Sequence, residues 1–220
     1  MIVGFGHVAR VGKDTGASAL TRDLGFYRLS FADPLKDLAL EADPLVRQMS
    51  SAVVNIGTGA ANLAHAVHGL RWEGAKDTYP EVRRFLQSLG LGARKVFGEN
   101  FWIDQVFSKM ENGKDYVIPD VRFENEADAI LAAGGLLIRI DRSGYKASGH
   151  TSETELADFD DWSAILRNDG DVREFQQAVV DYVKASDQWN QSSKSSARSS
   201  SSRSSSSGTA SPQPTFEAKK

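Results

Sequence analysis

The start of the chain joins a short apolar segment, through a turn rich in glycine, directly to a helix. Residues 2–5 are apolar and end among glycines, which is typical of a buried strand. Ala19, Leu20 and Leu24 then follow at helical spacing, and residues 26–31 alternate as a second strand does. Two strands joined by one helix form a βαβ unit, so the opening of the chain predicts an α/β fold with parallel strands.

The remainder of the chain continues this alternation around a long helical insertion. Residues 34–107 have a mostly helical pattern that we expect to form a lobe of several helices. The expected breaks between these helices are Pro44, Gly57 and Gly59, Gly74, Pro80, and the turn Gly90-Leu91-Gly92. Strands are predicted at 116–119 and 135–140, with a helix over 124–133 between them. The predicted fold is therefore a parallel sheet flanked by helices on both faces, with a helical lobe.

The composition changes abruptly after Trp189, where runs of serine begin. A segment of this kind buries too little apolar surface to offset its ordering entropy. We therefore expect one folded domain over residues 1–187 and a disordered tail over 188–220. The chain has no cysteine, so it offers neither disulfides nor thiolate metal sites.

The charge distribution limits the partners that the chain is expected to have. The net charge is −3, but the tail carries five Lys and Arg against one Glu, which leaves −7 on the rest of the chain. An acidic body disfavours a stable nucleic-acid complex, because such binding depends on neutralising phosphates. Small nucleotides are the expected partners, no membrane segment is expected, and the expected location is the cytoplasm. The oligomeric state, a homodimer included, stays open.

Gly12-Lys13-Asp14-Thr15 follows the first predicted strand and opens the first predicted helix. This is the place of a P-loop, where backbone N–H groups at a helix N-terminus hold phosphates and the lysine adds a mobile positive charge. Glycine is needed there because the backbone itself approaches the phosphate. The alternative is a turn from strand to helix that binds no ligand.

Two positions depart from the usual P-loop pattern. The usual first glycine falls on His7, with Gly6 one residue earlier, so the pattern suggests a loop with one extra residue. Asp14 replaces the usual hydroxyl, and Thr15 follows it. Either Asp14 or Thr15 could hold Mg²⁺, and the sequence does not decide between them.

Asp120 ends the apolar run of the third predicted strand. A carboxylate at this place, beside the P-loop, can orient magnesium or its waters. The alternative interpretation of Asp120 is a helix N-cap or a turn residue.

Arginine is frequent at positions that suit phosphate chemistry. Transfer of a phosphoryl group between two anions requires several positive charges, and the guanidinium group binds phosphate oxygens in pairs. The arginines so placed are Arg10, Arg83, Arg84, Arg94, Arg122, Arg139 and Arg142.

Several motifs follow one another along residues 1 to about 185. They are Gly12-Lys13-Asp14-Thr15, residues 30–36, 72–76, 80–90, 98–102 and 120–126, His150-Thr151-Ser152-Glu153, and Asn168-Asp169-Gly170. Together these motifs resemble one known family, the deoxynucleoside monophosphate kinases of tailed bacteriophages.

The resemblance implies a P-loop nucleoside monophosphate kinase fold and the transfer of a phosphoryl group from ATP, with Mg²⁺, to a deoxynucleoside monophosphate. It implies that Lys13, Arg10 and Thr15 contact the donor phosphates, and that Arg122 and Arg142 stabilise charge during transfer. On the acceptor side it places Asp33, Lys36, Arg83, Arg84, Gln87, Arg94, Trp102 and Glu153. For a phage-encoded enzyme the location would be the host cytoplasm.

Two other functions remain alternatives. The first is a kinase of the same fold that acts on another small acceptor, such as dephospho-coenzyme A. The second is a catalytically silent nucleotide-binding module, which the irregular loop at His7 leaves open. Turnover with ATP separates them, because a silent module binds nucleotide without forming ADP.

Overall fold

A parallel sheet forms the centre of the structure, which is a computed structural model that describes residues 1–47, 59–145 and 155–186. In these residues the sheet has five strands, all paired in parallel. Their order across the sheet is β2 (Tyr27–Arg28), β5 (Tyr116–Ile118), β1 (Ile2–Gly6), β6 (Leu136–Asp141) and β7 (Ala164–Arg167). The predicted α/β class with a parallel sheet is confirmed.

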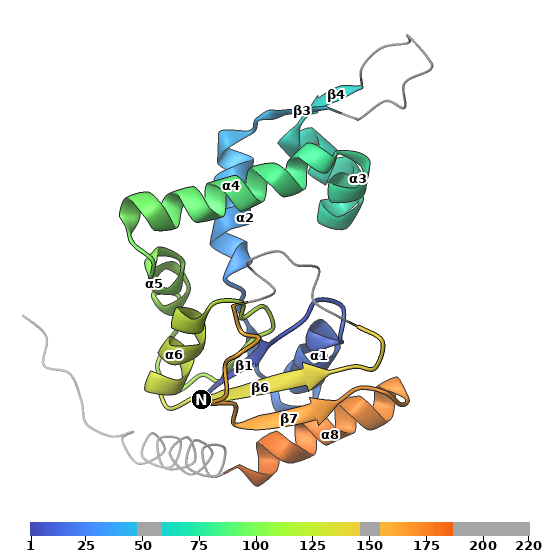
Figure 1. The fold of residues 1–220 in the computed structure, drawn as a ribbon, viewed down its shortest axis with the longest axis vertical. Coiled ribbons are helices and arrows are strands. Elements are labelled where there is room, and N and C mark those ends of the chain that lie inside the picture. The colour runs from blue at the N-terminus through green and yellow to red at the C-terminus, as the bar shows by residue number, and fades with distance from the viewer. Residues whose placement is uncertain (48–58, 146–154, 187–220) are drawn as a thin grey trace, which may run out of the picture.

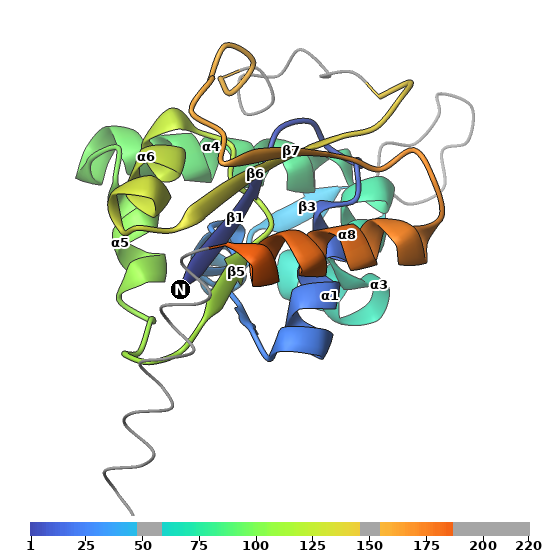
Figure 2. The same ribbon diagram turned by 90° about the horizontal axis from the view of Figure 1, so that it is seen from below.

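Helices cover both faces of this sheet (Figure 2). On one face lie α1 (Lys13–Leu24) and α8 (Val172–Ala185), and on the other lie α5 (Phe101–Phe107) and α6 (Glu124–Ala132). The central strand β1 serves both layers, because Val3 and Phe5 are fully buried on the α1 side while Gly4 faces α6. A Cβ at Gly4 would lie 2.7 Å from Cδ1 of Ile130, so glycine allows α6 to pack directly on the strand.

A helical lobe stands on the sheet (Figure 1). It consists of α2 (Ala32–Ala42), α3 (Leu63–Thr78) and α4 (Pro80–Phe97), together with the antiparallel pair β3 (Leu45–Arg47) and β4 (Ala60–Asn62). The lobe has its own apolar core, whose buried members include Ala39, Val46, Leu63, Val82 and Leu86. The predicted helical lobe is therefore present, with its own packing.

One predicted break within the lobe is displaced and one is wrong. The break expected at Gly74 occurs three residues earlier, where the φ of 59° at Arg71 interrupts the helical backbone of α3. The turn expected at Gly90-Leu91-Gly92 lies inside the continuous helix α4. Packing explains why α4 continues through these glycines. Gly90 lets Leu35 approach closely, and the carbonyl of Gly90 accepts a hydrogen bond from Trp102 Nε1 at 3.0 Å. Tertiary contacts here outweigh the low helix propensity of glycine.

Four elements were not predicted from the sequence: β3, β4, β7 and α8. The strand β4 reads Ala-Ala-Asn, which has little strand propensity, and it forms because β3 pairs with it. For α8 the signal was present, since Phe175, Val179, Val180 and Val183 share one buried face. The second predicted strand was placed over 26–31, whereas β2 covers only Tyr27–Arg28.

Some predictions lie outside the described residues. These are the disordered tail over 188–220, the break at Gly57, and the acceptor residue Glu153. In the part of the chain that is described, no helix combines the length and the apolar character that crossing a membrane requires.

Candidate active site

The carboxyl ends of β1 and β5 meet at a point where the chain leaves the sheet in two directions. After β1 the chain runs to α1 on one face, and after the neighbouring β5 it runs to α6 on the other. In open parallel sheets, the crevice between two such departures is where ligands bind. The loop of residues 7–12 and the side chains of Asp120 and Arg122 are therefore placed together by the strand order, although sequence separates them by more than a hundred positions.

The loop of residues 7–12, called the 7–12 loop below, has a backbone that turns through three residues with positive φ angles. Positive φ angles occur at His7 (85°), Arg10 (64°) and Gly12 (105°), and α1 begins directly after it. Lys13 turns back over the loop, where its Nζ donates to the carbonyl oxygens of His7 at 3.0 Å and Val8 at 2.5 Å. The lysine charge is thus held above the loop and the helix N-terminus, where an anion would bind.

His7 occupies the position of the usual first glycine, and its φ of 85° is one that glycine adopts readily. The imidazole Nδ1 is 3.2 Å from Oδ1 of Asp141 but without hydrogen-bonding geometry. Burial, followed by the positive charge of Arg139, lowers the pKa of His7 below its ordinary value, which favours the neutral imidazole.

The buried side chain of Asn168 holds the 7–12 loop through a hydrogen bond, a role that the sequence did not reveal. Its Nδ2 donates to the carbonyl of Val11 at 2.7 Å, and the side chain is buried. A Cβ at Gly12 would collide with this same Nδ2, so the loop needs glycine at position 12 for a second reason besides its φ. The motif Asn168-Asp169-Gly170 was the available signal, although it had no assigned role.

Asp120 uses both carboxylate oxygens to fasten the start of α2 to the end of β5. It accepts hydrogen bonds from Ser30 Oγ at 2.7 Å, Phe31 N at 3.0 Å and Ala32 N at 2.9 Å. This contact differs from the N-cap or turn role that was the alternative interpretation, because its partners Ser30, Phe31 and Ala32 lie 90, 89 and 88 positions earlier in the chain. The metal role of Asp120 stays a prediction, as does that of Asp14 and Thr15. In residues 1–47, 59–145 and 155–186, no three His, Asp or Glu side chains are grouped to hold a metal ion.

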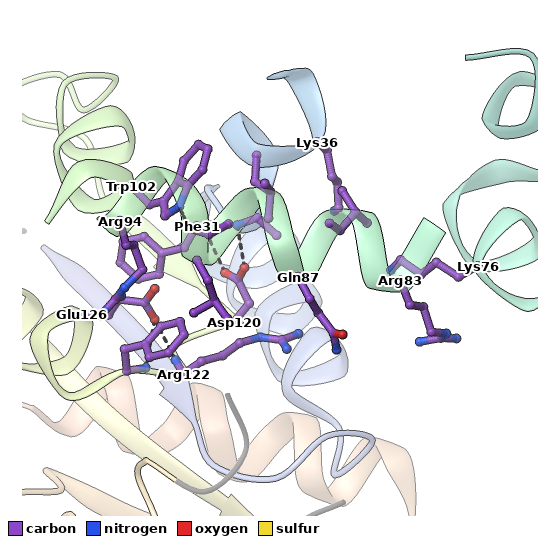
Figure 3. Close-up of a pocket in the computed structure, with 16 residues that line it drawn as sticks. Phe31, Lys36, Lys76, Arg83, Gln87, Arg94, Trp102, Asp120, Arg122 and Glu126 are labelled. Atoms are coloured by element: carbon purple, nitrogen blue, oxygen red, sulfur yellow. Dashed lines mark hydrogen bonds between the residues drawn. The ribbon is translucent and has the colours of Figure 1, made fainter. Parts of the chain in front are cut away.

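A cavity of about 220 Å³ lies between the helical lobe and the strand ends (Figure 3). Trp102, Arg94 and Glu126 lie at one end of it, and Arg83 and Lys76 at the other. Seven of the residues predicted as functional line this cavity: Lys36, Arg83, Gln87, Arg94, Trp102, Asp120 and Arg122. These residues come from α2, α4, α5 and the segment after β5, so only the fold brings them together.

Other predicted acceptor residues are not part of that cavity. Arg84 is exposed and lies 3.4 Å from Glu81. It does not line the cavity, because neighbouring positions on a helix point about 100° apart and Arg83 is the one that points to the cavity. Asp33 lies just outside the cavity lining, within 3.5 Å of both Arg28 and Lys36. Arg28 in turn is 3.6 Å from Asp14, and the sequence had given no role to Arg28.

A second cavity, of about 340 Å³, borders the 7–12 loop at the end of β6. Its lining includes His7, Val11, Arg139 and Arg142. The guanidinium of Arg142 lies 5.3 Å from the ring centre of Tyr145. The predicted residue Arg142 is therefore beside the loop on the side opposite to the acceptor residues, while Arg10 is exposed within the loop.

Glu126 is a buried carboxyl group in the first cavity that the sequence had not singled out. It is 3% exposed, and its Oε2 accepts from the backbone N–H groups of Arg122 at 2.8 Å and Phe123 at 3.2 Å. These bonds fix the turn that carries Arg122. Burial raises the pKa of Glu126 to about 8, mainly because the charged form loses its hydration.

This raised pKa predicts a stability that depends on pH. Between these two pKa values the folded state still holds a proton on Glu126 that the unfolded state, with its ordinary pKa of 4.5, has lost. The contribution of Glu126 to the free energy of unfolding is therefore complete below pH 4.5 and is lost as pH rises through about 8. Glu126→Gln keeps the accepting oxygen and removes the titration. Between pH about 5 and about 8 the free energy of unfolding should therefore decline more in the wild type, by at most a few kcal/mol.

Urea unfolding at a series of pH values measures this difference. Glu41→Gln, at an exposed position of α2, is the matched control and should keep the wild-type slope. An unchanged slope in Glu126→Gln would show that Glu126 ionises normally.

Comparison with known proteins gives one consistent family. The model of the deoxynucleotide monophosphate kinase family matches residues 64–179. A protein of Acanthamoeba polyphaga mimivirus, to which a deoxynucleotide monophosphate kinase activity is provisionally assigned, is 33% identical over 190 residues, covering 81% of this chain and 94% of its own length. The deoxynucleotide monophosphate kinase of Enterobacteria phage T4 is 30% identical over 110 residues, which are 47% of this chain and 45% of that protein.

A solved structure, dephospho-CoA kinase from Campylobacter jejuni, matches with a TM-score of 0.40 and 16% identity over 84% of this chain and 96% of that one. A likeness of this degree carries no argument about function. The match to the family model and the identity to the sequence relatives show that the chain belongs to the deoxynucleotide monophosphate kinase family.

Proposed function

We propose that the protein transfers the γ-phosphoryl group of ATP to a deoxynucleoside 5′-monophosphate, giving ADP and the deoxynucleoside diphosphate. The observation that carries the proposal is the 220 Å³ cavity, which combines aromatic and cationic side chains at the carboxyl end of β5, next to the strand that leads into the 7–12 loop. A nucleotide has one flat apolar part and one anionic part, and such a cavity suits both. Membership of the kinase family supports the same reaction.

On the donor side, the 7–12 loop would act as a P-loop. Its backbone N–H groups and the N-terminus of α1 would hold the phosphates of ATP. Lys13 would exchange its bonds to the carbonyls of His7 and Val8 for phosphate oxygens, and Arg10 would reach the same phosphates from the loop. The second cavity, with Arg142 at its wall, borders the loop and is the proposed place for the remainder of ATP.

The residues present fit Mg²⁺ in the way that kinases use it. This ion is usually held by one or two protein oxygens together with waters and substrate phosphates, so a protein cage is not required. The carboxylate of Asp14, which is 84% exposed, and the hydroxyl of Thr15 would hold it at the start of α1. Bound there, the ion would neutralise charge on the donor phosphates.

On the acceptor side, the two ends of the cavity would take the two parts of the nucleotide. Phe31 and Trp102 would contact the base, and Lys36 and Arg83 would attract the phosphate. Arg122 lies across from Gln87 and would stabilise charge on the group in transfer. The acceptor phosphate is already an anionic nucleophile, so catalysis would come from alignment and from these cations rather than from a general base.

A panel of acceptors tests this proposal. With ATP and Mg²⁺ constant, each deoxynucleoside monophosphate, its ribose counterpart and dephospho-coenzyme A are offered in turn, and ADP and product are measured. At least one deoxynucleotide should be converted to its diphosphate. The ribose form should be poorer, by roughly 10² at best, because a site packed against the sugar rejects an added hydroxyl only modestly.

Two outcomes would contradict the proposal in different ways. Turnover of dephospho-coenzyme A without any deoxynucleotide would keep the kinase chemistry and change the acceptor. Binding of ATP without phosphorylation of any acceptor would indicate a silent nucleotide-binding module.

A further inference from the structure

Arg94, on the lobe helix α4, is held in a fixed position at one end of the acceptor cavity. Its guanidinium carbon lies 4.0 Å from the ring centre of Phe123, so the group is stacked on an aromatic face. Both Nη1 and Nη2 donate to Oδ1 of Asn125, each at 3.3 Å. The neighbours of Arg94 in this part of the cavity are Trp102 and Glu126 (Figure 3).

Asn125 also binds a third part of the chain through the other half of its amide. Its Nδ2 donates to the carbonyl of Glu99 at 3.0 Å and to Oδ1 of Asn100 at 2.9 Å. One side chain in the first turn of α6 therefore holds both Arg94 and the turn between α4 and α5. This arrangement fixes the guanidinium relative to the sheet as well as relative to its own helix.

The chemical nature of this partner matters, because an amide holds an arginine without neutralising it. In the described residues no carboxylate oxygen lies within 4.0 Å of the Arg94 nitrogens. Two other arginines of α4 do form ion pairs, since Arg83 is 2.8 Å from Asp77 and Arg84 is 3.4 Å from Glu81. The carboxyl groups of Glu126 and Glu155 act on Arg94 electrostatically, but from beyond ion-pair distance. No direct ion pair therefore occupies the guanidinium, which lies in a partly buried place where a charged hydrogen bond to a ligand is strong.

We propose that Asn125 is a positioning residue of the acceptor site, which orients the guanidinium of Arg94 toward the nucleotide without forming an ion pair with it. The inference rests on the proposed function, because it requires that the cavity binds the acceptor. Asn125 itself need not touch the nucleotide. Its effect passes through Arg94, which gives the inference a specific test.

The test measures kcat and KM for the best acceptor of the panel, and KM for ATP, in the full chain. Asn125→Ala should raise the acceptor KM about tenfold, the usual effect of losing a hydrogen bond that involves a charged group. The kcat and the KM for ATP should change by less than about threefold, because the donor site is not touched. In an Arg94→Ala background the same substitution should have no further effect on the acceptor KM, since the two residues act as one unit.

Asn125→Asp separates orientation from charge. The carboxylate still accepts from Arg94 but now forms an ion pair with it, so the acceptor KM should rise at least as much as in Asn125→Ala. The carboxylate cannot donate to Glu99 and Asn100, so the melting temperature should fall in this variant as it does in Asn125→Ala. Asn100→Ala is the matched control, because it removes one partner of Nδ2 and leaves the bonds to Arg94 in place. It should keep the wild-type KM.

Three results would overturn the inference: a wild-type acceptor KM in Asn125→Asp, an additive effect of Asn125→Ala in the Arg94→Ala background, or an equal rise in KM in Asn100→Ala. If Asn125→Ala fails to fold, Asn125→Asp with and without Arg94→Ala carries the test. Acceptor affinity measured by calorimetry gives the same comparison without turnover. A wild-type protein that neither binds nor phosphorylates any deoxynucleotide would instead contradict the proposed function.

Discussion

Replacing Lys13 with alanine is expected to lower phosphoryl transfer by about 10²–10³ while leaving a folded protein, which is the usual effect of removing one preorganised donor of positive charge. The expectation rests on the place of its Nζ above the 7–12 loop, where it binds the carbonyls of His7 and Val8. The 7–12 loop itself contains no lysine that could replace it. Steady-state release of ADP measures the rate, and thermal unfolding checks the fold.

Lys109→Ala is the matched control for this substitution. Its side chain is 49% exposed and 3.9 Å from Asp37, so its removal should leave the rate within about twofold, as is usual for surface substitutions. Turnover near the wild-type level in Lys13→Ala would reject the assignment of the 7–12 loop as the donor phosphate site.

Gly12→Ala should reduce kcat/KM for ATP by about 10², although it adds only one methyl group. The backbone at Gly12 has a φ of 105°, which costs an alanine about 1–3 kcal/mol. The new Cβ would also collide with Nδ2 of Asn168, which is held in place by its bond to Val11. The loop must therefore move away from its present geometry, and the melting temperature should fall by several degrees.

The same substitution at Gly92 provides the control. Gly92 lies within α4, and a Cβ there would meet nothing within 4 Å. Gly92→Ala should leave activity unchanged and stabilise the protein by up to about 1 kcal/mol, because alanine loses less backbone freedom in a helix. If Gly12→Ala keeps both its melting temperature and its ATP kinetics, the loop tolerates a side chain and the argument from its geometry fails.

The sequence predicted helices and strands mainly where a run of apolar residues coincided with a buried element. Residues 2–5, and residues 135–140 apart from Arg139, are apolar because β1 and β6 are covered by helices on both faces. Buried strands of this kind are visible in sequence. The end of α4 was not visible in this way. Gly90 and Gly92 indicate a break by local propensity, and only contacts with Leu35 and Trp102 show why the helix continues.

Within the candidate site, the sequence identified residue types but not directions. Arg83 and Arg84 are equivalent in the sequence, yet only Arg83 lines the cavity, because adjacent helical positions point different ways. Asp120 was expected near the phosphates, and the structure shows its oxygens bonded to the start of α2. Glu126 and Asn168 had no assigned role, since the partners that give them one are backbone groups elsewhere in the fold.

The sequence by itself determined the α/β class, the position of the glycine-rich loop at the first strand-to-helix junction, and the family to which the chain belongs. These depend on local periodicity and on short motifs, both of which are written along the chain. Only the tertiary structure decided that His7 takes a glycine conformation, that Asn168 supports the loop across 157 positions, and that Asn125 holds Arg94. These features depend on which side chain meets which backbone group once strands distant in sequence become neighbours, and strand order is set by packing of the whole sheet rather than by any local segment.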